Sequence, residues 1–236
     1  MIDVIAFDAD DTLWRNETRY SEAKGEFVQL LQVYQSAETI QQRLDETEVQ
    51  NVQVYGYGIK SFTLSMIETA VELSSGRIEG REIQRIIEIA RAMLTAPIEL
   101  YAHVAETLEK LSKKHKLMLI TKGDRFEQES KIAKSGIGGY FGYVEIVGDK
   151  TITSYQAILA RYSISPRRFL MVGNSMRSDI LPVVRLGGWA VYIPQADTWS
   201  HENAIEQSLK AAQYHQLEHL GQLPELVLKL SKGVAE

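Results

Sequence analysis

The chain has 236 residues, of which 44% are hydrophobic and 24% charged, with a formal net charge of -5. These values are ordinary for a globular protein, and the absence of cysteine excludes disulfides, thiolate metal ligands and a cysteine nucleophile. The acidic balance argues against a nucleic-acid partner, and the lack of a long apolar run or signal peptide predicts a cytoplasmic protein without a membrane partner.

The first predicted element is a buried strand that ends in a cluster of acids. Residues 4–7 form an unbroken apolar run, which is typical of a central strand covered on both faces. Asp8, Asp10 and Asp11 follow, at the strand end where open α/β sheets bind ligands. Three neighbouring carboxylates repel one another and need a cation, so a functional site is favoured over an acidic turn or a helix cap.

Residues 15–97 follow with a helical pattern and almost no strand-like alternation. Apolar side chains recur at helical spacing over 19–34, 60–73 and 83–94. We predict about four helices, packed as a small bundle inserted after the first strand. Inside it, the sequence YGYGIK at 55–60 predicts either a loop that places Tyr57 and Lys60 on a substrate or a plain turn whose tyrosines pack in the bundle.

From residue 98 onward, predicted helices and strands alternate. The strands are expected at 117–121, 143–147, 169–172 and 190–193, and the helices at 101–114, 125–135, 153–162, 179–186 and 224–230. This order predicts an α/β fold, a Rossmann-like doubly wound parallel sheet with an inserted helical-bundle cap. The expected domains are an α/β core of residues 1–14 and 98–236 and a helical cap of residues 15–97.

Polar residues follow three further predicted strands and could converge with the acids. Thr121, Lys122 and Gly123 come after the second strand, where a glycine loop can cradle a phosphate, although Thr here could simply cap the next helix. Lys150 comes after the third strand, and a lone loop lysine is usually solvated. Residues 173–179, GNSMRSD, come after the fourth strand and could form a turn with a helix cap.

The order of these motifs resembles the haloacid dehalogenase-like (HAD) hydrolase superfamily. The matching features are DxDxT at residues 8–12, then a Thr, then a Lys, then a glycine-led acidic loop. The resemblance covers about residues 1–14 and 98–195, and it matches the insertion only as a helical bundle. It implies a Rossmann-like core and an enzyme, namely a phosphoric monoester hydrolase.

The resemblance also implies a role for each matching residue. Asp8 would be the nucleophile that forms an aspartyl-phosphate intermediate, and Asp10 would be the general acid and base. Thr121 and the backbone N–H of Lys122 would bind phosphoryl oxygens. Lys150 would neutralise the charge that Asp8 shares with the phosphate.

A magnesium ion is expected in this scheme, because a phosphate dianion would otherwise be repelled by the carboxylates. The ligands would be Asp8, the backbone carbonyl of Asp10, Asn174 and Asp179. Phosphatases of the family usually carry Asp where Asn174 stands. One negative charge is lost here, so the affinity for the metal is expected to depend more on Asp179.

Asn174 raises a second hypothesis, a haloacid dehalogenase, because those enzymes need no metal and carry a polar, non-acidic residue in this region. Asp10 favours the phosphatase, since displacing a halide requires no acid to protonate a leaving oxygen. A phosphomutase on the same residues and a weakly catalytic protein that binds a phosphorylated ligand are further alternatives.

In this family an insertion at this position closes over the nucleophile and favours small phosphorylated metabolites, so the resemblance implies a substrate of that kind. The gap between Thr121 and Lys150 is too short for a second cap, so the helical bundle is the only substantial lid expected. Further candidate substrate contacts are Arg15 and Asn16, which follow the catalytic strand, and Lys122, Gly123, Tyr57 and Lys60. The particular metabolite and the oligomeric state have no signature in the sequence.

Overall fold

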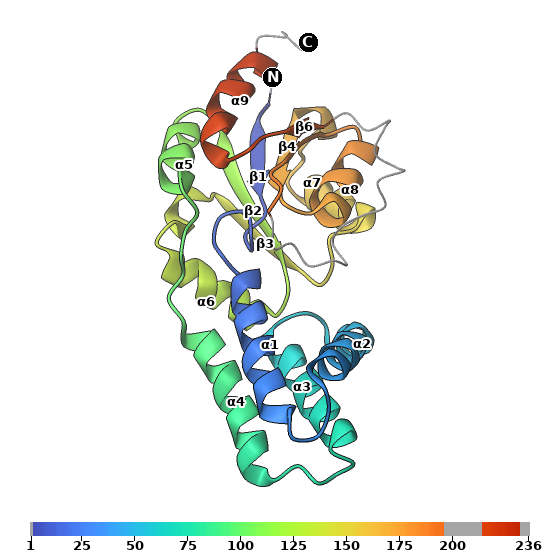
Figure 1. Ribbon diagram of the computed structural model, residues 1–236. Coiled ribbons are helices and arrows are strands. Elements are labelled where there is room, and N and C mark those ends of the chain that lie inside the picture. The colour runs from blue at the N-terminus through green and yellow to red at the C-terminus, as the bar shows by residue number, and fades with distance from the viewer. Residues whose placement is uncertain (1, 196–213, 232–236) are drawn as a thin grey trace. The chain divides into compact units, whose positions relative to one another are not determined.

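The computed structural model describes residues 2–195 and 214–231, which form two compact units (Figure 1). The α/β unit comprises Met1–Glu17, Ile98–Lys122 and Gln128–Glu236, and the helical unit comprises Thr18–Pro97 and Gly123–Glu127. The helical unit thus begins slightly later than the predicted cap. It also takes in five residues, Gly123–Glu127, that the prediction assigned to the core.

The α/β unit is built on a six-stranded sheet in which all neighbouring strands are parallel, in the order β3-β2-β1-β4-β5-β6. The strands are β1 Val4–Phe7, β2 Lys116–Lys122, β3 Tyr143–Val147, β4 Phe169–Gly173, β5 Trp189–Tyr192 and β6 His215–Gln216. The chain builds outward from β1 through β2 to β3, and then crosses to β4 on the other side of β1. This doubly wound order places the topological switch point between β1 and β4, where such sheets bind ligands.

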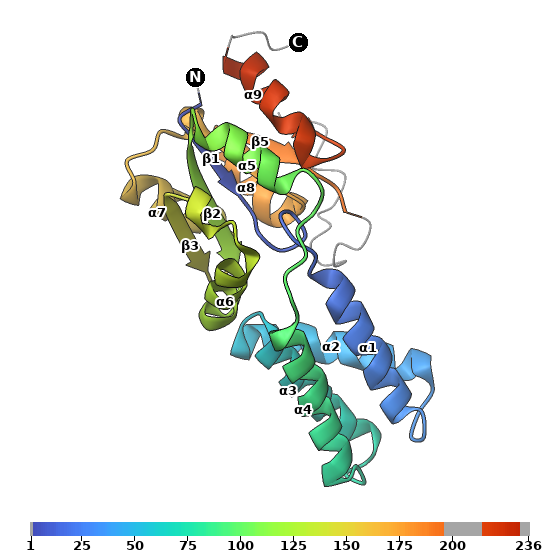
Figure 2. The ribbon, with the colours of Figure 1, turned by 90° about the vertical axis from the view of Figure 1, so that its left-hand side faces the viewer.

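Alternate side chains of the buried strands face two helical layers. Ile5 and Phe7 pack in one hydrophobic cluster with residues of α5 Val104–Ser112 and α9 Leu223–Ser231. Val4 and Ala6 pack in a second cluster with residues of α7 Ile152–Arg161 and α8 Leu181–Arg185. Figures 1 and 2 show these two helix pairs on opposite faces of the sheet. Because β1 is covered on both faces, it needs the unbroken apolar sequence that predicted it.

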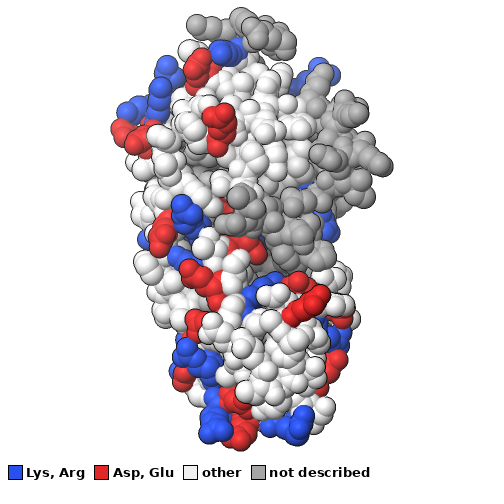
Figure 3. Space-filling model, viewed as in Figure 1, with Lys and Arg blue, Asp and Glu red and all other residues white. Residues whose placement is uncertain are grey.

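The helical unit contains four helices around its own hydrophobic core. They are α1 Glu17–Leu31, α2 Ala37–Tyr55, α3 Ile59–Leu73 and α4 Gly80–Thr95, the first residue of α1 belonging to the α/β unit. The core contains Phe27, Leu44, Met66 and Ile86, one from each helix and each at most 1% exposed. On the face shown in Figure 3, basic and acidic side chains lie interspersed over this unit. Arg85 of α4, for example, pairs with Glu26 of α1 at 2.8 Å.

The structure departs from the sequence prediction in two segments of the α/β unit. The predicted helix 179–186 is a π-helical turn, Met176–Ile180, followed by the short α8. The two-residue strand β6 pairs with β5 in a stretch predicted to be irregular. Its length gives no periodicity to detect, and its strand conformation depends on its neighbour.

Among the described residues, no helix combines the length and the apolar character that a membrane span requires.

Candidate active site

The candidate site forms at the switch point, at the carboxyl ends of β1 and β4. The backbone N–H of Asp8 donates to the carbonyl of Val172 at 2.9 Å, which continues the pairing of these strands beyond Phe7. Asp8 therefore leaves the sheet beside the glycine-led loop after β4. The prediction that the strand ends converge is confirmed by this geometry for Asp8, Lys150, Asn174 and Asp179.

Lys150 bridges two buried carboxylates. Its Nζ contacts Oδ1 of Asp8 and lies 2.7 Å from Oδ1 of Asp179. The three residues are 4%, 7% and 1% exposed, respectively, so this lysine is a buried ion-pair partner rather than the solvated loop residue that its type alone would suggest. Both carboxylates raise the pKa of Lys150 above its ordinary value, even though burial acts in the opposite direction. The ammonium group therefore stays charged at neutral pH.

The loop after β4 is shaped by a contact between Gly173 and Asp179. A Cβ atom at Gly173 would lie 2.2 Å from Oδ2 of Asp179, so only glycine leaves room for this carboxylate above the strand end. The same oxygen accepts from the backbone N–H of Ser175 at 3.0 Å, and the Ser175 hydroxyl accepts from the N–H of Ser178 at 2.9 Å. The π-helical turn that follows belongs to a class that is frequent at functional sites.

Thr12 connects the two sides of the switch point. Its hydroxyl lies 3.0 Å from Oδ2 of Asp8 and 3.2 Å from Oδ1 of Asn174. The amide oxygen of Asn174 and Oδ2 of Asp8 thus lie against the same hydroxyl. The Thr of the DxDxT pattern therefore brings together two oxygen atoms that are expected to bind a metal.

The cluster of Asp8, Asp10, Asp179 and Lys150 carries more negative than positive charge. Burial raises the pKa of Asp8 to about 7, Lys150 opposes this rise, and Asp179 and Asp10 add to it. An isolated Asp has a pKa of about 3.9, so the site holds an ionised Asp8 at a cost in free energy. A bound cation would remove that cost.

The residues present fit a magnesium ion. Asp8, Asn174 and Asp179 supply oxygen atoms only, which suits a hard cation, and the excess negative charge of the buried cluster is the observation that supports the fit. Among the described residues, no three His, Cys, Asp or Glu side chains gather as a metal-binding group. A metal here would therefore depend on the amide oxygen of Asn174 and on backbone or water ligands.

Asp10 points both carboxylate oxygens at hydrogen-bond donors. Oδ1 accepts from the indole N–H of Trp14 at 2.7 Å, Oδ2 accepts from the amide of Gln128 at 2.8 Å, and the ammonium group of Lys131 lies within 3.2 Å of both. Burial alone would raise the pKa of Asp10, but Lys131 and the hydrogen bonds from Gln128 and Trp14 outweigh it and lower the pKa. In this arrangement Asp10 is an ionised carboxylate.

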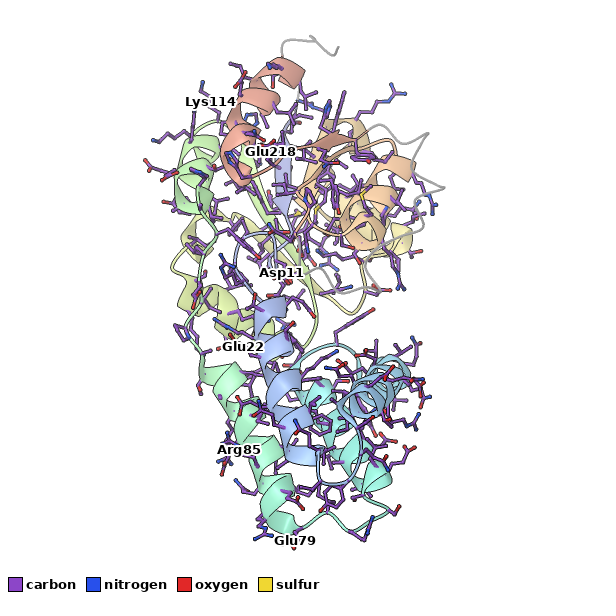
Figure 4. The ribbon with its side chains drawn as sticks, in the orientation of Figure 1. Asp11, Glu22, Glu79, Arg85, Lys114 and Glu218 are labelled. Atoms are coloured by element: carbon purple, nitrogen blue, oxygen red, sulfur yellow. The ribbon has the colours of Figure 1, made fainter. Side chains whose placement is uncertain are left out.

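Asp11 has a structural role at the start of α1. Its φ of 59° turns the chain after the acids, and its carboxylate accepts from the backbone N–H groups of Asn16 and Glu17 at 2.9 and 3.1 Å. Figure 4 labels Asp11 in this loop. Asn16 accepts from Lys131 at 2.8 Å, and the guanidinium of Arg15 lies 5.3 Å from the Tyr101 ring centroid. Arg15 and Asn16 stay predictions as substrate contacts.

Thr121 and Lys122 end β2 at the same edge of the sheet. The Thr121 hydroxyl, which is 1% exposed, donates to the side-chain oxygen of Gln128 at 3.2 Å. Nζ of Lys122 lies 3.2 Å from the hydroxyl of Ser178 in the loop after β4. Both side chains thus belong to the network around the switch point, and their expected contacts with a phosphate stay predictions.

The remaining substrate candidates belong to the helical unit. Nζ of Lys60 pairs with Oδ2 of Asp124 at 2.8 Å and lies 5.8 Å from the Phe126 ring centroid. Gly123 has a φ of 132°, in the region that favours glycine. Tyr57 is half-buried, and its role as a substrate contact, like those of Lys60 and Gly123, stays a prediction.

Sequence reasoning missed the residues that contact Asp10. Trp14, Gln128 and Lys131 carry no motif, since a glutamine and a lysine one turn apart on a helix occur on many surfaces. A usable signal was available, because Gln128 and Lys131 lie seven and ten residues after Thr121, on the helix that follows it. The spacing of three residues places them on one face of α6 Arg125–Ser135, and both are at least 93% buried.

A groove lies at the other edge of the sheet. It has a volume of about 1160 Å³ and is lined by the start of β1, the end of α5 and part of α9, including Ile2, Leu111 and Val227. None of the candidate site residues lines it. The candidate site is therefore defined by its hydrogen bonds and charges, and this groove is separate from it.

Comparison with known proteins identifies the family. A family model described as haloacid dehalogenase-like hydrolase matches residues 2–187. A comparison with curated sequences found no significant match. Among solved structures, a haloacid dehalogenase-like family hydrolase from Xanthomonas campestris is 39% identical, with a TM-score of 0.88, over 99% of this chain and 93% of that one.

Two more distant structures share the fold. A 2-haloacid dehalogenase from Pseudomonas syringae pv. Tomato is 19% identical with a TM-score of 0.65, over 98% of this chain and all of that one. A predicted phosphoglycolate phosphatase from Haemophilus somnus is 16% identical with a TM-score of 0.63, over 96% and 98% of the two chains. At these identities the likeness shows the fold alone. From the family model and the Xanthomonas relative, the chain belongs to the haloacid dehalogenase-like hydrolases and is an enzyme.

Proposed function

We propose that this hydrolase is a phosphatase that cleaves a small phosphomonoester through an aspartyl-phosphate on Asp8. The observation that carries the proposal is the pairing of Asp8 with the charged ammonium group of Lys150 at the switch point. A second carboxylate, that of Asp10, follows Asp8 by two residues in the chain. A lysine so placed can balance the charge that develops as a phosphoryl group joins Asp8. A dehalogenase has no leaving oxygen to protonate, and the second acid would have no task there.

The reaction proceeds in two steps on Asp8. In the first, a carboxylate oxygen of Asp8 attacks phosphorus, the bond to the leaving oxygen breaks, and that oxygen takes up a proton. In the second, water attacks the phosphorus of the aspartyl-phosphate, releasing inorganic phosphate and the Asp8 carboxylate. Asp10, which is ionised in the structure, would take up a proton from solvent before the first step, give it to the leaving oxygen and then accept one from the attacking water in the second. Lys150 stays beside Asp8 throughout.

Magnesium would be held by Asp8, Asn174, Asp179 and the carbonyl of Asp10, and when bound it would supply positive charge that draws the phosphate dianion to the carboxylates. Thr12 holds the Asp8 and Asn174 oxygens close together. Thr121 and the backbone N–H of Lys122 would bind phosphoryl oxygens. Tyr57 and Lys60 would contact the remainder of the substrate.

The test is phosphate release from a panel of small phosphomonoesters, with and without Mg²⁺. The wild type should release phosphate in a metal-dependent way, and Asp8→Asn should reduce the rate to background while circular dichroism stays unchanged. Asp3→Asn, at a partly exposed carboxylate paired with Arg168, serves as the matched control and should keep wild-type rates. Wild-type rates in Asp8→Asn would eliminate Asp8 as the nucleophile.

A dehalogenase is the second candidate, favoured by Asn174 and by the ionised state of Asp10. Both features suit a reaction in which the leaving group is a halide that needs no proton. Halide release from 2-chloropropionate without added metal, together with no phosphate release from any phosphomonoester, would replace the phosphatase proposal with this one.

A further inference from the structure

Helix α6 contacts the second acid of the site through two side chains on one face. The Gln128 amide donates to Oδ2 of Asp10 at 2.8 Å, and the Lys131 ammonium lies 3.1 and 3.2 Å from its two oxygens. Gln128 is 2% exposed and Lys131 7%. With the Trp14 indole on Oδ1 at 2.7 Å, these donors fix the rotamer of a carboxylate that would otherwise be repelled by Asp8 and Asp11.

The first turn of the same helix belongs to the other compact unit. The division between the units falls at the peptide bond between Glu127 and Gln128. Glu127 is 3% exposed, and its Oε2 accepts from the backbone N–H of Ile59, the first residue of α3, at 2.8 Å. The residue before α3, Gly58, offers no side-chain cap, so Glu127 supplies the acceptor that this helix start needs.

The fit between Glu127 and α3 is close. A Cβ atom at Gly58 would lie 2.9 Å from Oε2 of Glu127 and 3.1 Å from Cβ of Asp124, and the φ of Gly58 is 119°. Lys60, one residue into α3, pairs with Asp124 at 2.8 Å. The first turn of α6 is therefore held by the start of α3, while its second turn is held by Asp10.

We infer that Gln128 and Lys131 are positioning residues for Asp10 and that Glu127 anchors the first turn of their helix through the Ile59 N–H. This inference rests on the proposed phosphatase function. Loss of the Glu127 acceptor loosens the first turn of α6, and Gln128, the next residue, then holds the Asp10 carboxylate less firmly. Proton transfer to the leaving oxygen depends on how that carboxylate is held, whereas attack by Asp8 does not.

The test compares two substrates that differ only in their need for a proton. At neutral pH 4-nitrophenolate leaves from its phosphate unaided, whereas phenolate leaves from phenyl phosphate only with acid assistance, since an unperturbed phenol has a pKa of about 10. Gln128→Met and Lys131→Met remove the donors with little change of volume. We expect kcat for phenyl phosphate to fall by roughly 10-fold or more, with KM and the kcat for 4-nitrophenyl phosphate within about twofold of the wild type.

A third variant tests the connection through α6. Glu127→Ala removes the acceptor for the Ile59 N–H without touching Asp10, and it should lower the rate for phenyl phosphate selectively. Glu127→Gln keeps an acceptor oxygen and should restore the rate. Lys134→Met, one turn after Lys131 and exposed, is the matched control and should behave as the wild type on both substrates.

The outcomes separate this inference from the proposed function. A wild type silent on both aryl phosphates would overturn the phosphatase proposal and the inference with it. An active wild type whose Gln128, Lys131 and Glu127 variants lose both substrates equally, or lose neither, would leave the phosphatase standing and overturn the positioning role. A selective loss in the first two variants but not in Glu127→Ala would overturn the connection to α3.

Discussion

Replacing Asp8, the proposed nucleophile, by Asn should stabilise the metal-free protein, and only at high pH. The pKa of Asp8 is raised by burial from 3.8 to about 7. Between these values the folded protein keeps a proton that the unfolded chain has released, so the wild type loses stability as pH rises from about 4 to about 7. At about 1.4 kcal/mol per pH unit, the ionised Asp8 lowers the free energy of unfolding by up to about 4 kcal/mol at pH 8.

The Asn side chain in Asp8→Asn has the same shape as Asp but no charge to bury, so the variant should not lose stability as the pH rises. Urea unfolding in the presence of a chelator would measure both proteins at pH 4 and pH 8, provided that the m-value is unchanged. We expect the variant to be more stable by a few kcal/mol at pH 8 and by less than about 1 kcal/mol at pH 4. Asp3→Asn, at a partly exposed carboxylate, should show no such pH-dependent gain. An advantage of equal size at both pH values, or a less stable variant at pH 8, would refute the reasoning.

Three further substitutions follow from the geometry of the two units. Gly173→Ala would place a Cβ 2.2 Å from Oδ2 of Asp179; thermal unfolding should show a loss of about 3 kcal/mol or more, and near-normal stability would contradict the close contact. Gly58→Ala should lower the free energy of unfolding by about 2 kcal/mol, because of the positive φ and the clash with Glu127. The control Gly56→Ala should lower it clearly less, because Gly56 also has a positive φ but has no atom within 4 Å of the new Cβ. Asn174→Asp should tighten Mg²⁺ binding measured by calorimetry, and an unchanged affinity would remove Asn174 from the ligands.

The central strands of the α/β unit were predictable because burial on both faces leaves a simple signature. Residues 4–7 were assigned with the bounds that the structure gives, since an unbroken apolar run between polar residues has few alternatives. The bounds 143–147 were also right, although this edge strand is only partly buried and contains Glu145. The helix 125–135 was also assigned correctly, with Gly136 at a φ of 71° ending it. The π-helical turn at Met176–Ile180 was not, because it follows from the space that Asp179 occupies above Gly173.

The chemistry of the site was only partly visible in the sequence. Asp8, Lys150, Asn174 and Asp179 could be singled out, because each follows a strand of a parallel sheet, whose carboxyl ends share one edge. The environment of Asp10 was missed, because two of its donors lie on a helix more than a hundred residues later and match no motif. The assignment of Gly123–Glu127 to the helical unit was equally hidden, because it depends on the packing of that segment with the start of α3.

The carboxylate of Asp11 carries a consequence for transplanting lids between relatives. It accepts hydrogen bonds from Asn16 and Glu17, so the start of α1 is fixed by a residue of the catalytic loop. A chimaera joined at residue 15 would separate this acceptor from its two donors and begin the foreign bundle with a frayed helix. A junction after Glu17, with the return at Ile98 and residues 123–127 exchanged together with the bundle, keeps the hydrogen bonds of Asp11 in one parent and that between Glu127 and Ile59 in the other.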